Sequence, residues 1–269
     1  MVIQHNIAAI NSYRNLSTNQ SALSKNLEKL SSGYKINRAG DDAAGLAISE
    51  SMRSQINGLN QAVSNANDGV GLIQTAEGAL TETHSMLQRL KTLTTQAANG
   101  TYTDTARTNI KAEVDALTKE IDRISTATEF NGVKPLSANN TMTFQIGATK
   151  DETLTLNSAA MDSKSLQIDQ LSVKTVKEAN ASIDKINTAI DTVSTYRAQL
   201  GAAQNRMEHT INNLKVTSEN VTAAESRIRD TDMADEMTSY TKNNILMQAA
   251  QSMLAQSNSM PQGVLNMLQ

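Results

Sequence analysis

A single apolar stripe from about Asp42 to about Asn99 constrains the fold more than any other feature of the sequence. Its members recur at helical spacings: Ile48, Met52, Ile56, Leu59, Val63, Val70, Ile73, Leu80, Leu87, Leu90 and Leu93. This segment is much longer than an ordinary globular helix, and such length is typical of a coiled coil. The chain has only 12 Gly and 2 Pro in 269 residues, so it lacks the turn formers of a sandwich or barrel. We therefore expect a mainly α fold in which long antiparallel helices form a coiled-coil bundle.

Four further segments show the same periodicity. The first is expected from Gln4 to Ser32, because Gly33 can adopt the left-handed conformation that ends a helix. The others are expected from Thr105 to about Thr128, from about Val176 to about Arg229, and from Met233 to Ser259. We expect the last of these to stop at the turn signal Pro261-Gln262-Gly263.

The period becomes alternating in only one clear place, after Phe130-Asn131-Gly132. The alternating apolar residues flank a polar turn at residues 148–152: Met142, Phe144, Ile146, Leu154 and Leu156. This pattern predicts one small β-hairpin in the middle of the chain, near residues 141–157.

Both ends of the chain lack fixed charge. Residues 1–12 and 243–269 contain no Asp, Glu, Lys or Arg, although both segments are amphipathic. A helix exposed to water normally carries charges on its outer face, so we expect these ends to bury against each other or against neighbouring copies. The alternative is a frayed tail without fixed charge. The apolar faces that favour burial include Ile3, Ile7, Ile10, Leu246, Ala250, Met253 and Leu254.

The composition argues against several functions. A net charge of −3 leaves no basic surface for nucleic acid, and an aromatic content of 3% argues against an aromatic-walled substrate pocket. We also expect no membrane insertion, because no run of about 18 apolar residues is present. The N-terminus lacks the pattern of a secretory signal, so export would need another route.

No constellation for catalysis, cofactor binding or metal binding is evident. There is no Cys, and His5, His84 and His209 are far apart, with no His-Glu-x-x-His string. The Asp41-Asp42 pair is more typical of a helix cap than of a carboxylate dyad or cation site. We expect no catalytic residue, no cofactor and no metal ligand.

Glycines at positions 69, 71 and 78 do not form a phosphate-binding loop. No Lys-Ser/Thr pair follows them and no apolar strand precedes them. Their positions within the helical stripe predict sites where another element packs closely against this helix.

Four strings are more specific than the general periodicity. They are LEKLSSGYKINRAGDDAAGLAISESMRSQINGLNQA (residues 27–62), DGVGLIQTAEGAL (68–80), IDRISTATEFNG (121–132) and the C-terminal PQGVLNMLQ. Together they resemble bacterial flagellin over nearly the whole chain. The resemblance implies that residues 1–33 and 233–269 pair as an inner coiled-coil core domain, around which copies of the chain assemble. Residues 42–229 would then form the helical bundle with its hairpin, in a short subunit that has only the core domains.

The resemblance also implies a function and its partners. The chain would self-assemble into the extracellular flagellar filament for swimming motility, after export in an unfolded state through the flagellar type III system. The implied partners are further copies of the chain, hook-associated and cap proteins, an export chaperone at the C-terminus and host Toll-like receptor 5. Open filaments arise naturally from contacts between identical subunits that do not close into a ring.

For the receptor, alignment with the family's strings implies a set of contact residues: Gln88, Arg89, Leu93, Gln96 and Glu113. Arg89 is the strongest candidate, because its guanidinium can make several directed hydrogen bonds across an interface. The alternative is that Arg89 lies on a solvated helix face and contacts a neighbouring subunit.

Three other interpretations compete with the filament subunit. A hook-filament junction protein resembles flagellin at both ends, but the continuous match through residues 40–47 and the PQGVL tail favour flagellin. A flagellin that carries a metallopeptidase would need a His-Glu-x-x-His string, which is absent. A general secreted coiled-coil adaptor would explain the heptads but not the specific strings.

Overall fold

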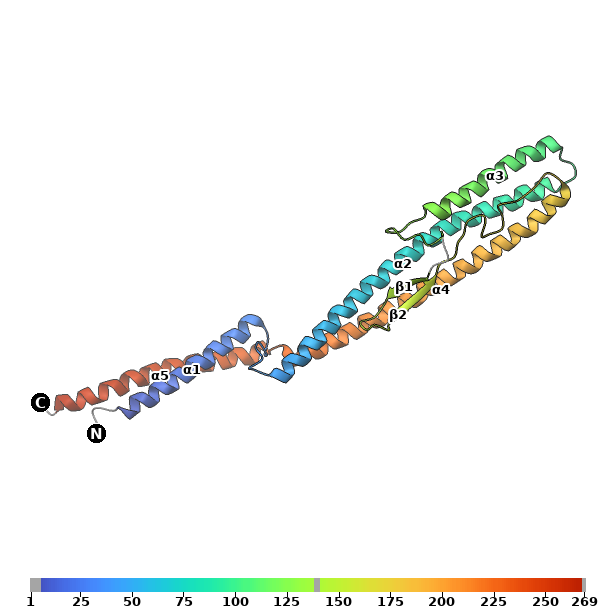
Figure 1. Cartoon of the computed structure of the whole chain (residues 1–269). Helices are drawn as coiled ribbons and strands as arrows, with labels where there is room; N and C mark the ends of the chain where they lie inside the picture. The colour runs from blue at the N-terminus through green and yellow to red at the C-terminus, as the bar shows by residue number, and fades with distance from the viewer. Residues whose placement is uncertain (1–5, 138–140, 268–269) are drawn as a thin grey trace. The chain divides into compact units, whose positions relative to one another are not determined.

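The computed structural model describes residues 6–137 and 141–267, and this part of the chain is mainly helical. Figure 1 shows its elements, whose bounds follow in chain order: α1 (Ile7–Ser32), α2 (Ala43–Ala97), α3 (Asp104–Ala127), β1 (Thr141–Gln145), β2 (Thr153–Asn157), α4 (Val176–Arg229) and α5 (Met233–Met267). The predicted fold class, long helices with one small hairpin in the middle of the chain, is confirmed. The predicted bounds of the first four helices agree with the structure to within about three residues.

The chain divides into two compact units, which are described separately. Unit 1 contains Met1–Ile56 and Glu219–Gln269, and unit 2 contains Asn57–Ser218. The boundaries between the units lie inside α2, after residue 56, and inside α4, before residue 219, so unit 1 includes the first turns of α2 and the last turns of α4. The physical reason is that the first turns of α2 and the last turns of α4 are joined to each other by polar contacts, described below.

In unit 1, α1 and α5 lie side by side (Figure 1). The Asn6 side chain caps α1 by accepting a hydrogen bond from the backbone N–H of Ala9 at 3.1 Å. At the other end, Gly33 has a φ of 75°, and its N–H donates to the carbonyl of Lys29 at 2.8 Å. The predicted stop at Gly33 is thus confirmed, since glycine enters the left-handed region without a steric cost.

The end of α5 differs from the prediction. The helix continues through residue 261 to Met267, whereas the sequence predicted a stop at Pro261-Gln262-Gly263. A proline removes one N–H donor from a helix and disfavours helical geometry in the residue before it, which lowers helix stability without always ending the helix.

The turn between α1 and α2 is held by two carboxylates. Asp42 Oδ1 accepts the N–H of Gly45 at 2.9 Å, which confirms the predicted helix cap. Asp41 Oδ2 accepts the N–H groups of Arg38 at 3.0 Å and of Asn37 at 3.2 Å. These backbone donors, Arg38 first, hold the pKa of Asp41 below its ordinary value. Both carboxylates of the Asp41-Asp42 pair are therefore used as hydrogen-bond acceptors for the backbone of the turn and of the first turn of α2.

The core of unit 2 follows the heptad repeat. Its largest fully buried side chains come from all three helices and from the segments that join them: Ile73, Leu80, Leu87, Leu90, Val114, Ile121, Leu136, Ile168, Val173, Ile186, Leu200 and Met207. Spacings of seven recur within α2, α3 and α4, so each helix directs one narrow stripe toward the others. This seam is what the sequence periodicity predicted.

The hairpin lies in unit 2 with its apolar side against this core. Met142 pairs with Leu156 and Phe144 pairs with Leu154, while the threonines between them are exposed. Asn65 of α2 fastens the hairpin by donating its side-chain N–H to the carbonyl of Gln145 at 3.1 Å. The two strands thus present one apolar face, as the alternation predicted.

The prediction that three glycines of α2 permit close packing is only partly correct. A Cβ at Gly69 would lie 2.9 Å from the Met207 Cε atom and 3.2 Å from the Phe144 ring, so a larger residue would push against both. At Gly71 the Phe130 ring would be at an ordinary contact distance of 3.5 Å. The prediction was wrong for Gly78, which has nothing within 4 Å.

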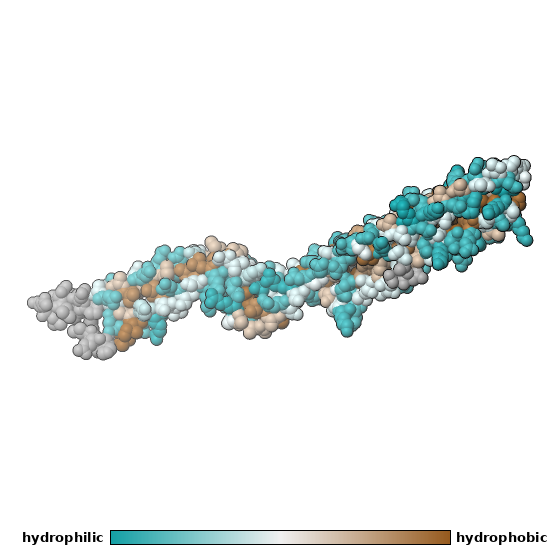
Figure 2. All heavy atoms as spheres, turned by 45° about the horizontal axis from the view of Figure 1, so that its top comes forward, coloured by the Kyte–Doolittle hydropathy of each residue, from teal (hydrophilic) through white to brown (hydrophobic). Residues whose placement is uncertain are grey.

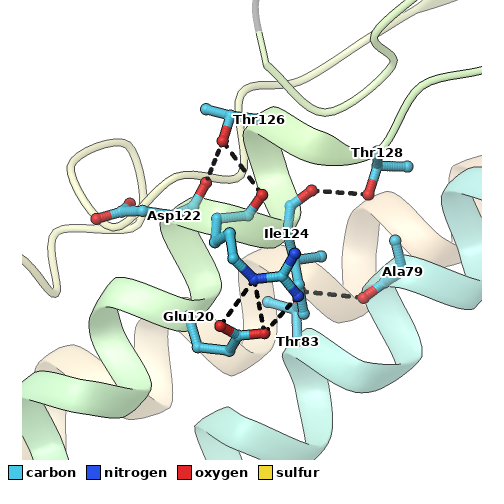
Figure 3. Close-up of polar contacts among 8 residues, drawn as sticks. Ala79, Thr83, Glu120, Asp122, Ile124, Thr126 and Thr128 are labelled. Atoms are coloured by element: carbon cyan, nitrogen blue, oxygen red, sulfur yellow. Dashed lines mark hydrogen bonds and ion pairs between the residues drawn. The ribbon is translucent and has the colours of Figure 1, made fainter.

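Polar side chains near the end of α3 fasten the segments that follow it. The Asp122 carboxylate accepts the backbone N–H of Ser163 at 2.7 Å and its hydroxyl at 2.9 Å. Figure 3 shows that neighbouring hydroxyls serve their own helix instead, since Thr126 donates to the Asp122 carbonyl at 2.9 Å and Thr128 to the Ile124 carbonyl at 2.7 Å. The carboxylate of Asp122 therefore joins α3 to a segment 41 residues farther along the chain.

Candidate interaction surfaces

A groove runs between α1 and α5 in unit 1. It has a volume of about 350 Å³ and is lined by Ser12, Asn15, Thr18, Asn19, Leu246, Ala249, Ala250 and Met253. None of these residues is charged, and four of them are aliphatic or contain a thioether. The groove is therefore a neutral, partly apolar surface on a helix pair, which is unusual for a face left to water.

The apolar residues predicted at the chain ends are only partly covered within the chain. The two largest exposed fractions belong to Ile7, at 62%, and Met253, at 63%, while Ile10 and Leu246 are also exposed. Ala250 and Leu254 are half-buried, and Ile3 lies outside the described residues. Figure 2 shows brown, hydrophobic patches over this part of the molecule. Pairing of α1 with α5 thus leaves apolar surface that a further partner could bury.

One polar contact ties the two chain ends together near their tips. The Asn6 side chain donates a hydrogen bond to the carbonyl of Ser257 at 2.8 Å, across a separation of 251 residues. Farther along the pair, Lys29 lies 3.7 Å from Glu236. These contacts set the register of α1 against α5, because apolar packing alone has little directional preference.

A second polar cluster, the junction network, joins α2 to the end of α4 within unit 1. The hydroxyl of Ser49, which is fully buried, donates to Glu225 Oε1 at 3.0 Å, and Arg229 Nη1 donates to the same hydroxyl at 3.5 Å. The Arg229 guanidinium also lies 3.7 Å from Glu50 and 4.7 Å above the centre of the Tyr34 ring. This network was not predicted from the sequence, where its one signal is Ser49, a serine on the apolar stripe of α2.

The residues aligned with the receptor site lie on α2 and α3 in unit 2. Arg89 donates to Glu113 Oε1 from Nε at 2.9 Å and from Nη2 at 2.8 Å, and about half of each side chain is exposed. Gln88 contacts His84 at 2.9 Å, and Gln96 donates to the Tyr102 hydroxyl at 2.8 Å. Four of the five predicted residues thus belong to an exposed polar surface across these two helices.

Leu93 is the exception in this set. Its exposed fraction is 3%, and it belongs to the hydrophobic core of unit 2. It lies three residues after Leu90, on the stripe that packs toward the rest of the bundle. Leu93 therefore supports the surface from beneath and is not available to contact a partner directly.

None of the helices in the described part of the chain combines the length and the hydropathy that crossing a bilayer requires. Within the same residues, no three His, Cys, Asp or Glu side chains gather so that they could hold a metal ion.

Comparison with known proteins identifies the family. The model for the bacterial flagellin N-terminal helical region matches residues 3–141, and the model for the C-terminal helical region matches residues 183–268. The chain belongs to the bacterial flagellins. The resemblance stated from the sequence is thus confirmed, and as a flagellin the chain is a structural subunit of the flagellar filament.

Relatives of this flagellin match along its full length. It is 50% identical to the flagellin of Bacillus subtilis (strain 168) over 303 aligned residues, with 100% of both chains covered. It is 45% identical to the flagellar filament 33 kDa core protein of Treponema phagedenis, again with 100% of both chains covered. Among solved structures, Bacillus cereus flagellin is 33% identical with a TM-score of 0.52, over 60% of this chain and 94% of that chain.

A further solved structure shares the fold alone. It is assigned to a flagellar hook-associated protein from Vibrio parahaemolyticus, with 14% identity and a TM-score of 0.60, over 71% of this flagellin and 100% of that chain. Fold therefore does not separate a filament subunit from a hook-associated protein, whereas the full-length identity to flagellins does.

Proposed function

We propose that this flagellin polymerises through the neutral surface that α1 and α5 form together. The observation that carries the proposal is the coincidence of exposed apolar side chains with the uncharged ends of the chain, notably Ile7, Ile10 and Met253. Apolar surface of this kind gains about 25 cal/mol for each Å² removed from water. Contacts repeated between identical subunits in a head-to-tail sense then give an open filament.

The test removes residues 243–269 from the full chain. The shortened chain should remain monomeric after salting-out, because most of one helix of the pair is lost. Unit 2 should still fold, since its core lies within residues 57–218. Electron microscopy reports polymerisation, and far-ultraviolet circular dichroism reports folding.

Point variants make a sharper comparison than the truncation. Leu246→Ser together with Met253→Ser should impair polymerisation, while Gln248→Ser, an exposed change on the same helix, should not. Normal filaments from the truncated chain, or equal polymerisation by both point variants, would contradict the proposed surface.

Export in an unfolded state through the flagellar type III system is part of the same proposal. Its support is that the chain contains no Cys, so no disulfide can cross-link it. An export chaperone would cover α5, because exposed apolar surface promotes nonspecific association before assembly. Hook-associated and cap proteins would contact the same helices at the two ends of the filament.

The alternative, a hook-filament junction protein, predicts a different product. Such a protein would stop at short rings, whereas a filament subunit would continue to elongate from added seeds. The full-length identity to flagellins supports the filament subunit.

Recognition by host Toll-like receptor 5 is proposed through Arg89 and its surroundings. Because Arg89 is already paired with Glu113, a receptor would have to add to this pair or replace it. In a receptor reporter-cell assay, Arg89→Ala should signal less strongly than the wild type. Arg123→Ala is a matched control, since Arg123 is exposed and paired with Glu120 on α3. Equal loss of signal in both variants would refute a specific role for Arg89.

A further inference from the structure

The methionines of this flagellin fall into groups of very different exposure. Met161 and Met207 in unit 2 are buried, with exposed fractions of 2% and 0%. By contrast, every methionine with high exposure in the described part of the chain lies on α5: Met233 at 49%, Met237 at 49%, Met253 at 63% and Met260 at 56%. An oxidant in solution would therefore reach the thioethers of α5 before those of the core.

Met253 has the most consequential position of these residues. It lines the groove between α1 and α5, and it shares one helix face with Leu246 and Met260, which lie seven residues before and after it. The groove has no charged residue that could pair with a new polar group. A sulfoxide introduced there would have to lose its hydration when a neighbouring copy covers the surface, with the hydroxyl and amide side chains of the α1 wall as its possible hydrogen-bond donors.

The chemistry is oxygen transfer from a peroxide to sulfur. The thioether sulfur attacks one oxygen of hydrogen peroxide, the O–O bond breaks and an S=O bond forms. The proton of the attacked oxygen passes to the second oxygen, which leaves as water. The sulfur is oxidised by two electrons and the peroxide is reduced by two. The product, methionine sulfoxide, is polar, and dedicated reductases can return it to methionine. No thiol competes for the oxidant, because the chain has no Cys.

We propose that the exposed methionines of α5, Met253 foremost, form an oxidation site at which a peroxide reversibly blocks self-association. This inference rests on the proposed function, because it requires the α1 and α5 surface to be buried in the filament. Free subunits carry the site open to solvent, and assembled subunits protect it.

The first experiment measures the order of oxidation. The soluble full-length chain is treated with hydrogen peroxide, and peptide mass mapping follows the gain of one oxygen at each methionine. Met233, Met237, Met253 and Met260 should react before Met161 and Met207. Equal rates at all these positions would overturn the inference.

The second experiment measures polymerisation. Oxidised subunits should show a critical concentration about tenfold higher than untreated subunits, which is the effect of losing the burial of one methionine side chain. Treatment with methionine sulfoxide reductase should restore the original value. Met253→Leu, which preserves volume, is compared with its own untreated state, and peroxide should raise its critical concentration much less than it raises that of the wild type. The buried control Met161→Leu should stay as sensitive to peroxide as the wild type.

The outcomes separate this inference from the proposed function. Filaments that form equally well from oxidised and untreated wild type would overturn the inference and leave the proposed function intact. Undiminished sensitivity in Met253→Leu would also overturn it. Failure of untreated subunits to polymerise at all would instead contradict the proposed function.

Discussion

Two leucine-to-alanine changes should separate the stability of this flagellin from its assembly. Leu87 is fully buried in the core of unit 2, whereas Leu246 has an exposed fraction of 41% on α5. Deleting the buried side chain leaves a cavity, so Leu87→Ala should lower the free energy of unfolding by about 3 kcal/mol. For a domain of this size, that corresponds to a fall in Tm of roughly 10 °C.

Leu246→Ala should act on a different equilibrium. Because much of its side chain is exposed in the single chain, we expect the free energy of unfolding to fall by only about 1 kcal/mol. In the filament, burial of the remaining surface of the Leu246 side chain contributes about another 1 kcal/mol. The alanine variant loses this contribution, so its critical concentration for polymerisation should rise about fivefold.

Thermal unfolding followed by circular dichroism measures the first effect, and sedimentation of polymer at increasing protein concentration measures the second. If Leu246→Ala lowers Tm as much as Leu87→Ala, or leaves the critical concentration unchanged, then α5 is not an exposed assembly surface.

Three further variants test particular contacts. Burial raises the pKa of Tyr196, with the Ala159 backbone acting in the opposite direction. The contribution of neutral Tyr196 to the free energy of unfolding should therefore be fully present below about pH 10, the ordinary tyrosine pKa, and be lost as the pH rises through the folded pKa. A Tyr196→Phe variant with the same alkaline loss of stability in urea titrations would refute this. Asp122→Ala removes both hydrogen bonds to Ser163 and should lower the free energy of unfolding by about 2 kcal/mol in urea titrations. An unchanged urea midpoint would show that these two hydrogen bonds contribute nothing to stability. The pKa of Asp41 is lowered below 3.8, so the contribution of the ionised carboxylate to the free energy of unfolding should be present above that pH and be lost as the pH falls through the folded pKa. Acid unfolding should be less steep in Asp41→Asn, and identical acid-unfolding curves for the variant and the wild type would contradict this contribution.

Sequence periodicity predicted the helices well because their cores are narrow heptad stripes. The spacing of seven through Leu80 and Leu87 is written directly into the sequence and corresponds to one face of α2. The bounds expected for the fourth helix, Val176–Arg229, are those of α4. Likewise, the alternation around residues 141–157 gave both the hairpin and its inward face.

Long-range polar contacts could not be predicted in the same way. Asp122 and Ser163 are 41 residues apart, and Ser49 and Glu225 are 176 residues apart. Hydrogen bonds of this kind depend on where loops and helix ends meet in space, and they leave no periodic pattern in the sequence. The continuation of α5 through Pro261 is a similar case, because local signals give only a probable helix boundary.

The candidate surfaces were predicted in part. Uncharged chain ends led to the prediction of an assembly surface on α1 and α5, whereas the exposure of Ile7 and Met253 within a single chain emerges only from the structure. In the receptor set, alignment alone selected Leu93, although its spacing from Leu87 and Leu90 already indicated a buried face.

The central claim is that this chain is a filament subunit that assembles through its paired terminal helices. It is tested most directly by electron microscopy of the purified, heat-dissociated protein after slow salting-out, with and without short filament seeds. The account predicts long helical filaments that elongate from the seeds. Monomers or short rings alone, even with seeds present, would contradict it.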